Sequence, residues 1–178
     1  MADVPKAVDS VLREEDATLS GVITDTKGDD GGKTRFGIAS RFHPELLEST
    51  YYTTMDAADA LQIAVLTMEK DYATPMRIAA IEDQVLATKF LSFGVNASPE
   101  TAVRAMQYAV NRVYPGSALE VTVDGEMGPL TVAAINRCMA ESLLNSFRLR
   151  MVGYYNSICR PKPSQLKFLC GWIDRALM

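Results

Sequence analysis

The chain has 178 residues, of which 48% are hydrophobic and 22% are charged, and its formal net charge is −4. This length can bury a core in one domain or two small lobes, and the acidic balance excludes a broad basic footprint for nucleic acid. No stretch is long and apolar enough to cross a bilayer, so we expect no membrane insertion.

The first predicted helix spans about residues 3–16 and ends in an acidic residue. Val8, Val11 and Leu12 recur at helical spacing, and Glu15 takes the next position on this stripe. An apolar wall raises the pKa of a carboxyl group, because the charged form loses hydration. Such a group can donate a proton to a glycosidic oxygen. Glu15 is therefore a candidate general acid, with Glu14 as its rival and a solvated helix end as the alternative interpretation.

A small hairpin is predicted beside this helix. Short strands are expected at residues 21–24 and 34–39, joined by a segment rich in glycine and aspartate. Turn chemistry explains Asp30 in this segment, whereas Asp29 is also a functional candidate. Thr34 is either a functional residue or an ordinary β-residue. The segment fits neither a phosphate-binding loop, because the glycine spacing is wrong, nor a calcium loop, because Lys27 occupies a ligand position.

The rest of the chain is predicted to be helical, at residues 56–72, 76–87, 98–113, 129–158 with a break, and 164–177. Ser98 followed by Pro99 is a strong helix start. A composition shift at residues 96–99 predicts lobes at 1–96 and 97–178, packed as one compact unit. The expected fold class is mainly α, a helical bundle with one small β-hairpin.

Metal-binding signals are weak. His43 is the only histidine and is expected to be structural or on the surface. The three cysteines match no metal motif, and we expect reduced thiols, with a Cys159–Cys170 disulfide as the alternative. We predict no metal or organic cofactor. The first residues lack the basic start and apolar run of a secretory signal, so synthesis in the cytoplasm is expected.

Several motifs in order resemble glycoside hydrolase family 108, the lysozyme-like N-acetylmuramidases of prophages and endolysin-type secretion systems. The N-terminal signature is Leu12-Arg13-Glu14-Glu15 followed by Asp29-x-Gly31-Gly32-x-Thr34-x-x-Gly37-Ile38. The second half is similar to the predicted peptidoglycan-binding module that usually follows in this family. Its motifs are Met106-Gln107-x-Ala109-Val110-Asn111, Val123-Asp124-Gly125-x-x-Gly128-Pro129-x-Thr131 and Phe168-Leu169-x-Gly171-Trp172-x-x-Arg175.

This resemblance implies a lysozyme-like α+β fold that hydrolyses the β-1,4 bond between N-acetylmuramic acid and N-acetylglucosamine. Glu15 matches the catalytic glutamate, and Asp29 and Thr34 match positions that support water or the cation-like transition state. If Asp29 activates water, the two carboxyl groups should lie roughly 6.5–9.5 Å apart, the inverting geometry. Candidate substrate-binding residues are Tyr72, Asn96 and Gln107. The expected partners are peptidoglycan glycan strands and, for release to the periplasm and cell wall, a holin or secretion system.

The chain also departs from the family pattern. The family normally has two glycines and an aromatic residue after the catalytic glutamate, whereas Asp16 and Ala17 follow Glu15, and the gap to Asp29 is longer than usual. Ser92 stands where an aspartate is expected. Two other functions therefore stay open: a lytic transglycosylase that uses Glu15, and a non-catalytic peptidoglycan-binding or secretion-helper protein.

Overall fold

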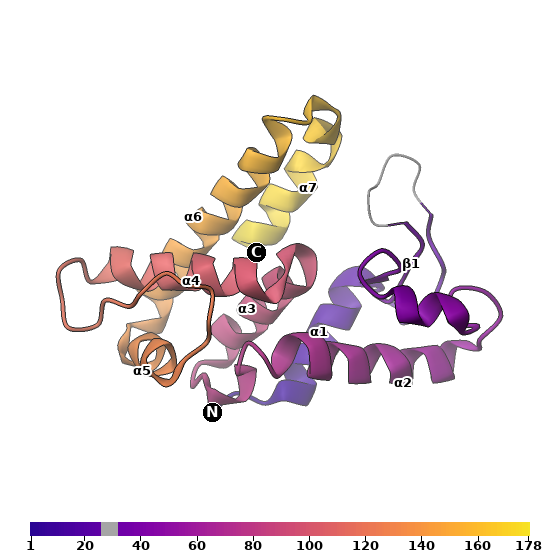
Figure 1. Ribbon diagram of the computed structural model, residues 1–178, viewed down its shortest axis with the longest axis horizontal. Helices are drawn as coiled ribbons and strands as arrows, with labels where there is room; N and C mark the ends of the chain where they lie inside the picture. Colours follow the sequence, from indigo (N-terminus) through magenta and orange to yellow (C-terminus); the bar gives the residue numbers. More distant parts are fainter. Residues whose placement is uncertain (26–31) are drawn as a thin grey trace.

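The computed structural model describes residues 1–25 and 32–178 (Figure 1). Within these residues the fold is mainly helical, with one small antiparallel sheet of β1 (Thr34–Arg35) and β2 (Ile38–Ala39). The α-helices are α1 (Val4–Glu15), α2 (Ala57–Thr67), α3 (Gln84–Ala97), α4 (Pro99–Val113), α5 (Pro129–Arg137), α6 (Ala140–Cys159) and α7 (Leu166–Leu177). Shorter 3₁₀ segments are η1 (Pro44–Glu48), η3 (Ile78–Ala80) and η4 (Pro163–Gln165), and η2 (Met68–Ala73) is a π-helix. The predicted fold class is confirmed.

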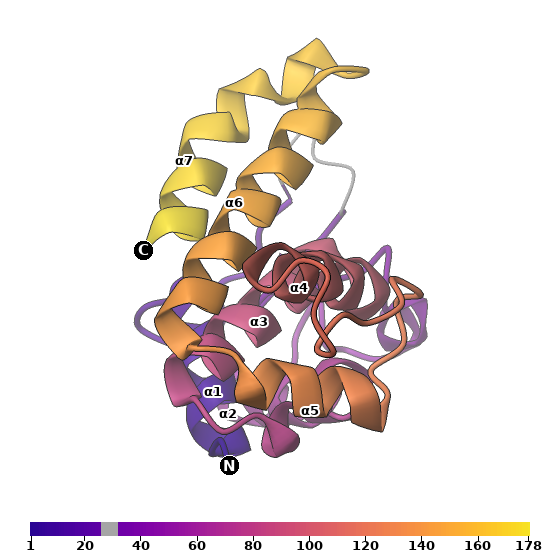
Figure 2. The same ribbon diagram turned by 90° about the vertical axis from the view of Figure 1, so that its left-hand side faces the viewer.

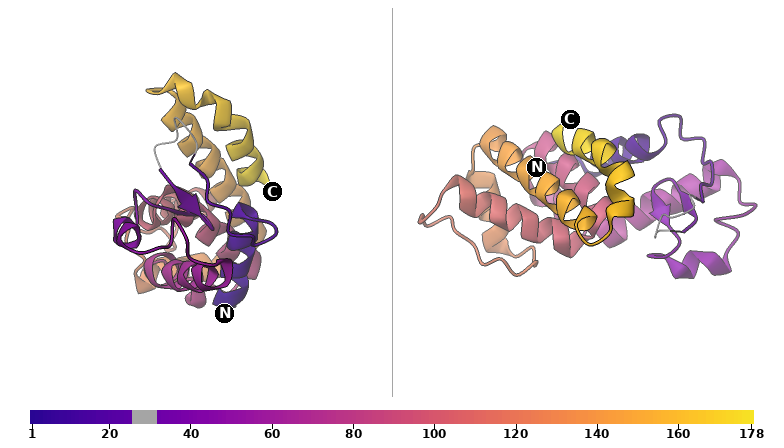
Figure 3. Two further views of the ribbon diagram at one scale, coloured as in Figure 1. Left: turned by 90° about the vertical axis from the view of Figure 1, so that its right-hand side faces the viewer. Right: turned by 90° about the horizontal axis from the view of Figure 1, so that it is seen from above.

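The last two α-helices form an antiparallel pair that rises from the rest of the molecule (Figures 1 and 2). The chain turns at η4 and runs back along α6, so the C-terminus returns to the neighbourhood of α3. Seen from above, the β-hairpin and α5 lie toward opposite ends of the molecule, with α6 and α7 between them (Figure 3). This return brings the end of the chain close to the end of α1.

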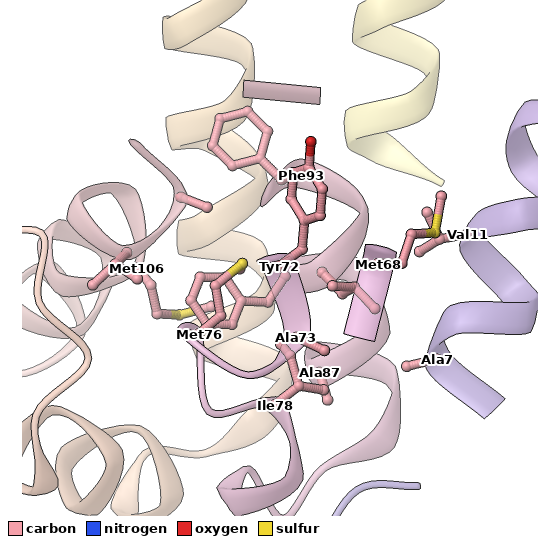
Figure 4. Packing of buried hydrophobic residues seen from close by; sticks show 14 of the residues in the cluster. Ala7, Val11, Met68, Tyr72, Ala73, Met76, Ile78, Ala87, Phe93 and Met106 are labelled. Atoms are coloured by element: carbon pink, nitrogen blue, oxygen red, sulfur yellow. The ribbon is translucent and has the colours of Figure 1, made fainter. Parts of the chain in front are cut away.

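One continuous hydrophobic core joins the first and second halves of the chain. Figure 4 shows buried side chains that converge from α1, η2, α3 and α4, among them Val11, Met68, Phe93 and Met106. All four side chains are fully buried. The neighbouring stripe residues Val8 and Leu12 are at most 2% exposed, so α1 is anchored along its apolar stripe. The residue at the end of that stripe therefore has a fixed position.

Helix starts follow the capping residues in the sequence. Side chains of Asp3, Asp56 and Ser98 accept hydrogen bonds from backbone N–H groups in the first turns of α1, α2 and α4. The predicted helices at the N-terminus, at residues 56–72 and at 98–113 are confirmed. The predicted break in the long helix is also present, at Cys138 and Met139 between α5 and α6.

The prediction of a helix at residues 76–87 is wrong. Arg77 has a φ of 48°, in the left-handed region, so the helix cannot continue through it. The chain forms η3 instead, and α3 begins only at Gln84, where the Asp83 carboxylate accepts a hydrogen bond from the Leu86 N–H at 2.7 Å. The helix predicted at residues 164–177 begins later, at Leu166, because Ser164 lies inside η4.

The hairpin is formed by a different part of the chain than predicted. Residues 34–39 form both strands, with a turn at Phe36 and Gly37. In the expected strand at 21–24, Thr24 alone makes a β-bridge, with Thr34. The reason is local: Phe36 and Gly37 both adopt positive φ angles, which a continuous strand cannot accommodate.

The predicted division into lobes at residues 1–96 and 97–178 stays a prediction. Ser98 separates α3 from α4 near this boundary. Among the described helices, none is long and apolar enough to cross a membrane. Cys138, Cys159 and Cys170 are all unpaired, the first two buried and the third exposed.

Candidate active site

Glu15 is the last residue of α1, and its side chain is 20% exposed. Its aliphatic part packs against the turn of the β-hairpin, because a Cβ atom added to Gly37 would lie 2.8 Å from the Glu15 Cγ. Gly37 also has a φ of +77°, a conformation that glycine adopts at little cost. The hairpin and α1 therefore fix the stem of the Glu15 side chain and leave its carboxyl group at a partly open position.

The carboxyl group of Glu15 pairs with an arginine from the other end of the chain. The Nη1 atom of Arg175, in α7, lies 3.3 Å from the Glu15 Oε1. The same nitrogen donates a hydrogen bond to the Asn96 Oδ1. The apolar wall expected beside this carboxyl group is thus incomplete, because the Glu15 side chain at the end of the stripe reaches the guanidinium of Arg175 in α7.

Two further side chains extend this polar contact across α3. The Ser92 hydroxyl donates a hydrogen bond to the Glu14 Oε2 at 2.6 Å, and the Asn96 Nδ2 donates to the Ser92 carbonyl at 2.9 Å. An aspartate in place of Ser92 would face the Glu14 carboxylate, which explains why serine is tolerated here. We call Glu14, Glu15, Ser92, Asn96 and Arg175 the Glu15 cluster.

Asp16 has a structural role in the loop that follows α1. Its carboxylate accepts hydrogen bonds from the Gly21 N–H at 2.7 Å, the Ser20 hydroxyl at 3.0 Å and the Thr18 hydroxyl at 3.1 Å. Partial burial raises the pKa of Asp16, but these hydrogen bonds outweigh it and hold the pKa below its usual value. The departure from the family pattern after Glu15 is therefore compensated by a side chain that closes the loop.

Of the two predicted partners of Glu15, Thr34 and Asp29, the structure describes only Thr34. Thr34 lies in β1, where its backbone pairs with Thr24 and Ala39. Its hydroxyl lies 3.4 Å from the Gly32 carbonyl, which is long for such a hydrogen bond. The position of Thr34 thus satisfies the ordinary β-residue interpretation, and a catalytic role stays a prediction. Asp29 lies outside the described residues, so its role and its distance from Glu15 also stay predictions.

Tyr72 and Asn96, both predicted to bind substrate, line the same pocket of about 370 Å³. The exposed ring of Phe42 lies at this pocket, and apolar rings of this kind can stack on sugar faces. Asn96 also accepts a hydrogen bond from Arg175, the partner of Glu15, so this residue connects the pocket to the Glu15 cluster. Glu15 itself is not among the residues that line the pocket. Substrate binding by Tyr72 and Asn96 stays a prediction.

A buried histidine forms the floor of this pocket. The His43 Nε2 lies 2.9 Å from the Tyr72 hydroxyl, and its Nδ1 lies 3.2 Å from the Glu45 Oε1. Burial raises the pKa of Tyr72 to about 12, with smaller increases from Asp71 and Glu45, so its hydroxyl keeps its proton. In the described part of the chain, His43, Glu45 and Asp71 bring ligand atoms within 4.8 Å of one another, and these three could hold a metal ion.

Gln107 does not face this pocket. It is 0% exposed, its Nε2 donates to the Asp124 Oδ1 at 2.7 Å, and its Oε1 accepts from the Gly125 N–H at 3.0 Å. The hydrogen bond from Gln107 lowers the pKa of Asp124, together with one from the Glu126 N–H. A side chain that is fully buried and bonded has no surface to offer a sugar, so we assign Gln107 to holding the 124–126 loop and leave it out of the candidate site.

Sequence reasoning missed the role of Arg175. The residue was visible in the motif of the last helix, but nothing local indicates which residue it contacts. From the sequence, Tyr155 beside Tyr154 fits either a residue of a sugar cleft or a partly buried core residue. In the structure Tyr155 is 2% exposed and feels the charges of Arg175, Glu15 and Glu14.

Comparisons with known proteins identify the family of this chain and a solved structure of similar fold. The family model Glycosyl hydrolase 108 matches residues 9–97, and the model Predicted Peptidoglycan domain matches residues 101–177. Among solved structures, the fold is similar to that in "Structure of Brucella abortus SagA", with a TM-score of 0.66 and 18% sequence identity over 98% of this chain and 93% of that chain. A search of curated proteins found no match.

Proposed function

Because the chain belongs to the glycosyl hydrolase 108 family and carries a predicted peptidoglycan domain, we propose that it is an N-acetylmuramidase. Family membership makes the chain a glycoside hydrolase, with peptidoglycan as its substrate. The finer part of the proposal has two elements. The cleaved bond is the β-1,4 linkage between N-acetylmuramic acid and N-acetylglucosamine, and the general acid is Glu15.

One observation carries the choice of Glu15. Its side chain lies at the end of the buried stripe of α1, is held between the hairpin turn and Arg175 of α7, and is still 20% exposed. Its neighbour Glu14 is turned toward α3 and accepts the Ser92 hydroxyl. A fixed but reachable carboxyl group suits a general acid, because a misplaced proton donor loses most of its effect.

In the proposed reaction, Glu15 donates a proton to the glycosidic oxygen. As the bond between this oxygen and the anomeric carbon breaks, positive charge develops at the anomeric carbon. A second carboxylate activates water on the opposite face, and Asp29 is our proposed group for this step. Thr34 is proposed to assist it, and Tyr72 and Asn96 to bind the sugar. Since the wall lies outside the cytoplasm, the proposal includes a holin or secretion system that releases the protein.

Digestion of purified Gram-negative sacculi, with mass spectrometry of the soluble fragments, tests the reaction. A muramidase releases fragments with a reducing-end muramic acid, which borohydride reduces. Fragments that end in anhydro-muramic acid would instead identify a lytic transglycosylase. Pelleting with sacculi without any fragments, across substrates with different cross-links, would contradict the enzyme proposal and favour a wall-binding protein.

A further inference from the structure

Tyr155 in α6 carries a buried hydroxyl group without a partner. The residue is 2% exposed, and its hydroxyl oxygen makes no hydrogen bond with any described residue. A buried hydroxyl in this state costs free energy, because it has given up water without replacement. Groups of this kind are rare in folded proteins and often mark a functional position.

The aromatic contacts of Tyr155 place it against the Glu15 cluster. Its ring stacks on Trp172 of α7, with ring centroids 5.4 Å apart, and meets Phe93 of α3 edge-on at 5.9 Å. Residues three apart share a helix face, so Arg175 follows Trp172 on α7 and Asn96 follows Phe93 on α3. Arg175 and Asn96 are hydrogen-bonded to each other. The Tyr155 ring therefore contacts both helices that carry the hydrogen-bonded pair of Arg175 and Asn96.

Electrostatics agree with this placement. Burial raises the pKa of Tyr155 to about 12; the Arg175 charge lowers it, and Tyr154, Glu15 and Glu14 raise it. The hydroxyl is therefore protonated at neutral pH and feels the charges of both members of the Glu15–Arg175 pair.

The ion pair raises a difficulty for the proposed chemistry. Glu15 attracts the Arg175 guanidinium as an anion, but a general acid must carry a proton before it can act. Once Glu15 is protonated, Arg175 loses its charged partner in a place where its side chain is only 27% exposed. The Asn96 Oδ1 then remains as an acceptor for the guanidinium, and a largely buried cation is stabilised by a further one. The Tyr155 oxygen is an acceptor with free lone pairs.

We propose that Tyr155 is a positioning residue that acts on Glu15 through Arg175. When Glu15 is protonated, the Tyr155 oxygen accepts an N–H from the guanidinium and holds Arg175 back. Glu15 is then free to face the glycosidic oxygen. No covalent bond changes in this step, since one hydrogen-bond partner of Arg175 replaces another. The inference rests on the proposed function of Glu15.

Tyr155→Phe tests the inference, and Tyr154→Phe is its matched control. Both residues pack on Phe93, and phenylalanine keeps either ring in place while removing one oxygen. On solubilised glycan strands we expect Tyr155→Phe to lower kcat about tenfold, the scale of one hydrogen bond to a charged group, with KM unchanged. Its Tm should stay the same or rise, because the lost hydroxyl had no partner. Tyr154→Phe should stay within about twofold of the wild type.

Wild-type kcat in Tyr155→Phe would overturn the inference, and so would an equal loss in both variants. A double-mutant cycle with Arg175→Met decides whether Tyr155 acts through Arg175. We expect no further loss when Tyr155→Phe is added to Arg175→Met, whereas losses that multiply would overturn the inference. An inactive wild type would instead contradict the proposed function, so the two failures are distinguishable.

Discussion

The Nη1 atom of Arg175, in the last helix, lies 3.3 Å from the Oε1 atom of Glu15, at the end of the first helix. Glu15 falls in the segment matched by the glycosyl hydrolase model, and Arg175 falls in the segment matched by the peptidoglycan domain model. The second segment therefore contributes a side chain to the surroundings of the candidate acid.

Replacement of Arg175 should separate activity from stability. The pair is partly exposed, so Arg175→Met should lower the free energy of unfolding by no more than about 1 kcal/mol. Activity on sacculi should fall about tenfold or more, because the ionised Glu15 carboxylate is no longer held in place before it takes up its proton. Arg175→Lys keeps the charge but loses the planar fork, so its activity should lie between that of the wild type and that of Arg175→Met. Full activity in Arg175→Met would show that the ion pair has no part in catalysis.

Gly37→Ala should damage both stability and activity. The new Cβ would lie 2.8 Å from the Glu15 Cγ, and the φ of +77° is strained for alanine. Gly116→Ala is the matched control, because Gly116 has a similar φ of +70° but open space around its Cβ position. We expect Gly116→Ala to lose about 1 kcal/mol of stability and keep its activity. Equal activity in both variants would contradict the packing of Gly37 on Glu15.

The pH dependence of stability should report Asp16. Because its folded pKa lies below the unfolded value of about 4, its stabilisation is present above that pH and is lost as pH falls through the folded pKa. Asp16→Asn should therefore have a lower Tm than the wild type at neutral pH, and the difference should shrink toward about pH 3. Thermal unfolding across this range measures it. A difference that is constant with pH would contradict the assignment.

Asp29→Asn tests the second proposed carboxylate, which lies outside the described residues. If Asp29 activates water, the variant should lose about a hundredfold or more in hydrolysis and still pellet with sacculi. NMR of the first-formed anomer should show inversion with the wild type. Retained activity in Asp29→Asn would show that another group handles the water, and Asp30→Asn is the control on the neighbouring position.

Several features of this fold follow from local sequence signals, and others depend on contacts that no local signal encodes. The helices that begin at Asp3, Asp56 and Ser98 were predictable, because a capping side chain precedes an apolar stripe at each. The helix α3 was not, since its buried residues, among them Phe90, Leu91, Ser92 and Phe93, leave no clear polar face. Its periodicity is therefore weak.

The candidate site divides in the same way. The position of Glu15 at the end of α1 was predictable, because it continues the stripe of its own helix, whereas its catalytic role stays a prediction. Arg175 and Tyr155 were not predictable, since their approach to Glu15 depends on the return of α7 along α6, a tertiary contact between the two ends of the chain. Gln107 was misassigned because a polar residue in a motif suggests a ligand contact, whereas its complete burial is visible only in the folded molecule.

The most direct test of the account compares Glu15→Gln with Glu14→Gln on purified sacculi. Both variants replace a carboxylate by an isosteric amide at neighbouring positions, and only the first removes the proposed proton donor. We predict that Glu15→Gln releases no fragments with reducing-end muramic acid above background, while Glu14→Gln remains active and both proteins fold with similar Tm. Fragment release by Glu15→Gln at the wild-type rate would contradict the assignment of Glu15 as the general acid.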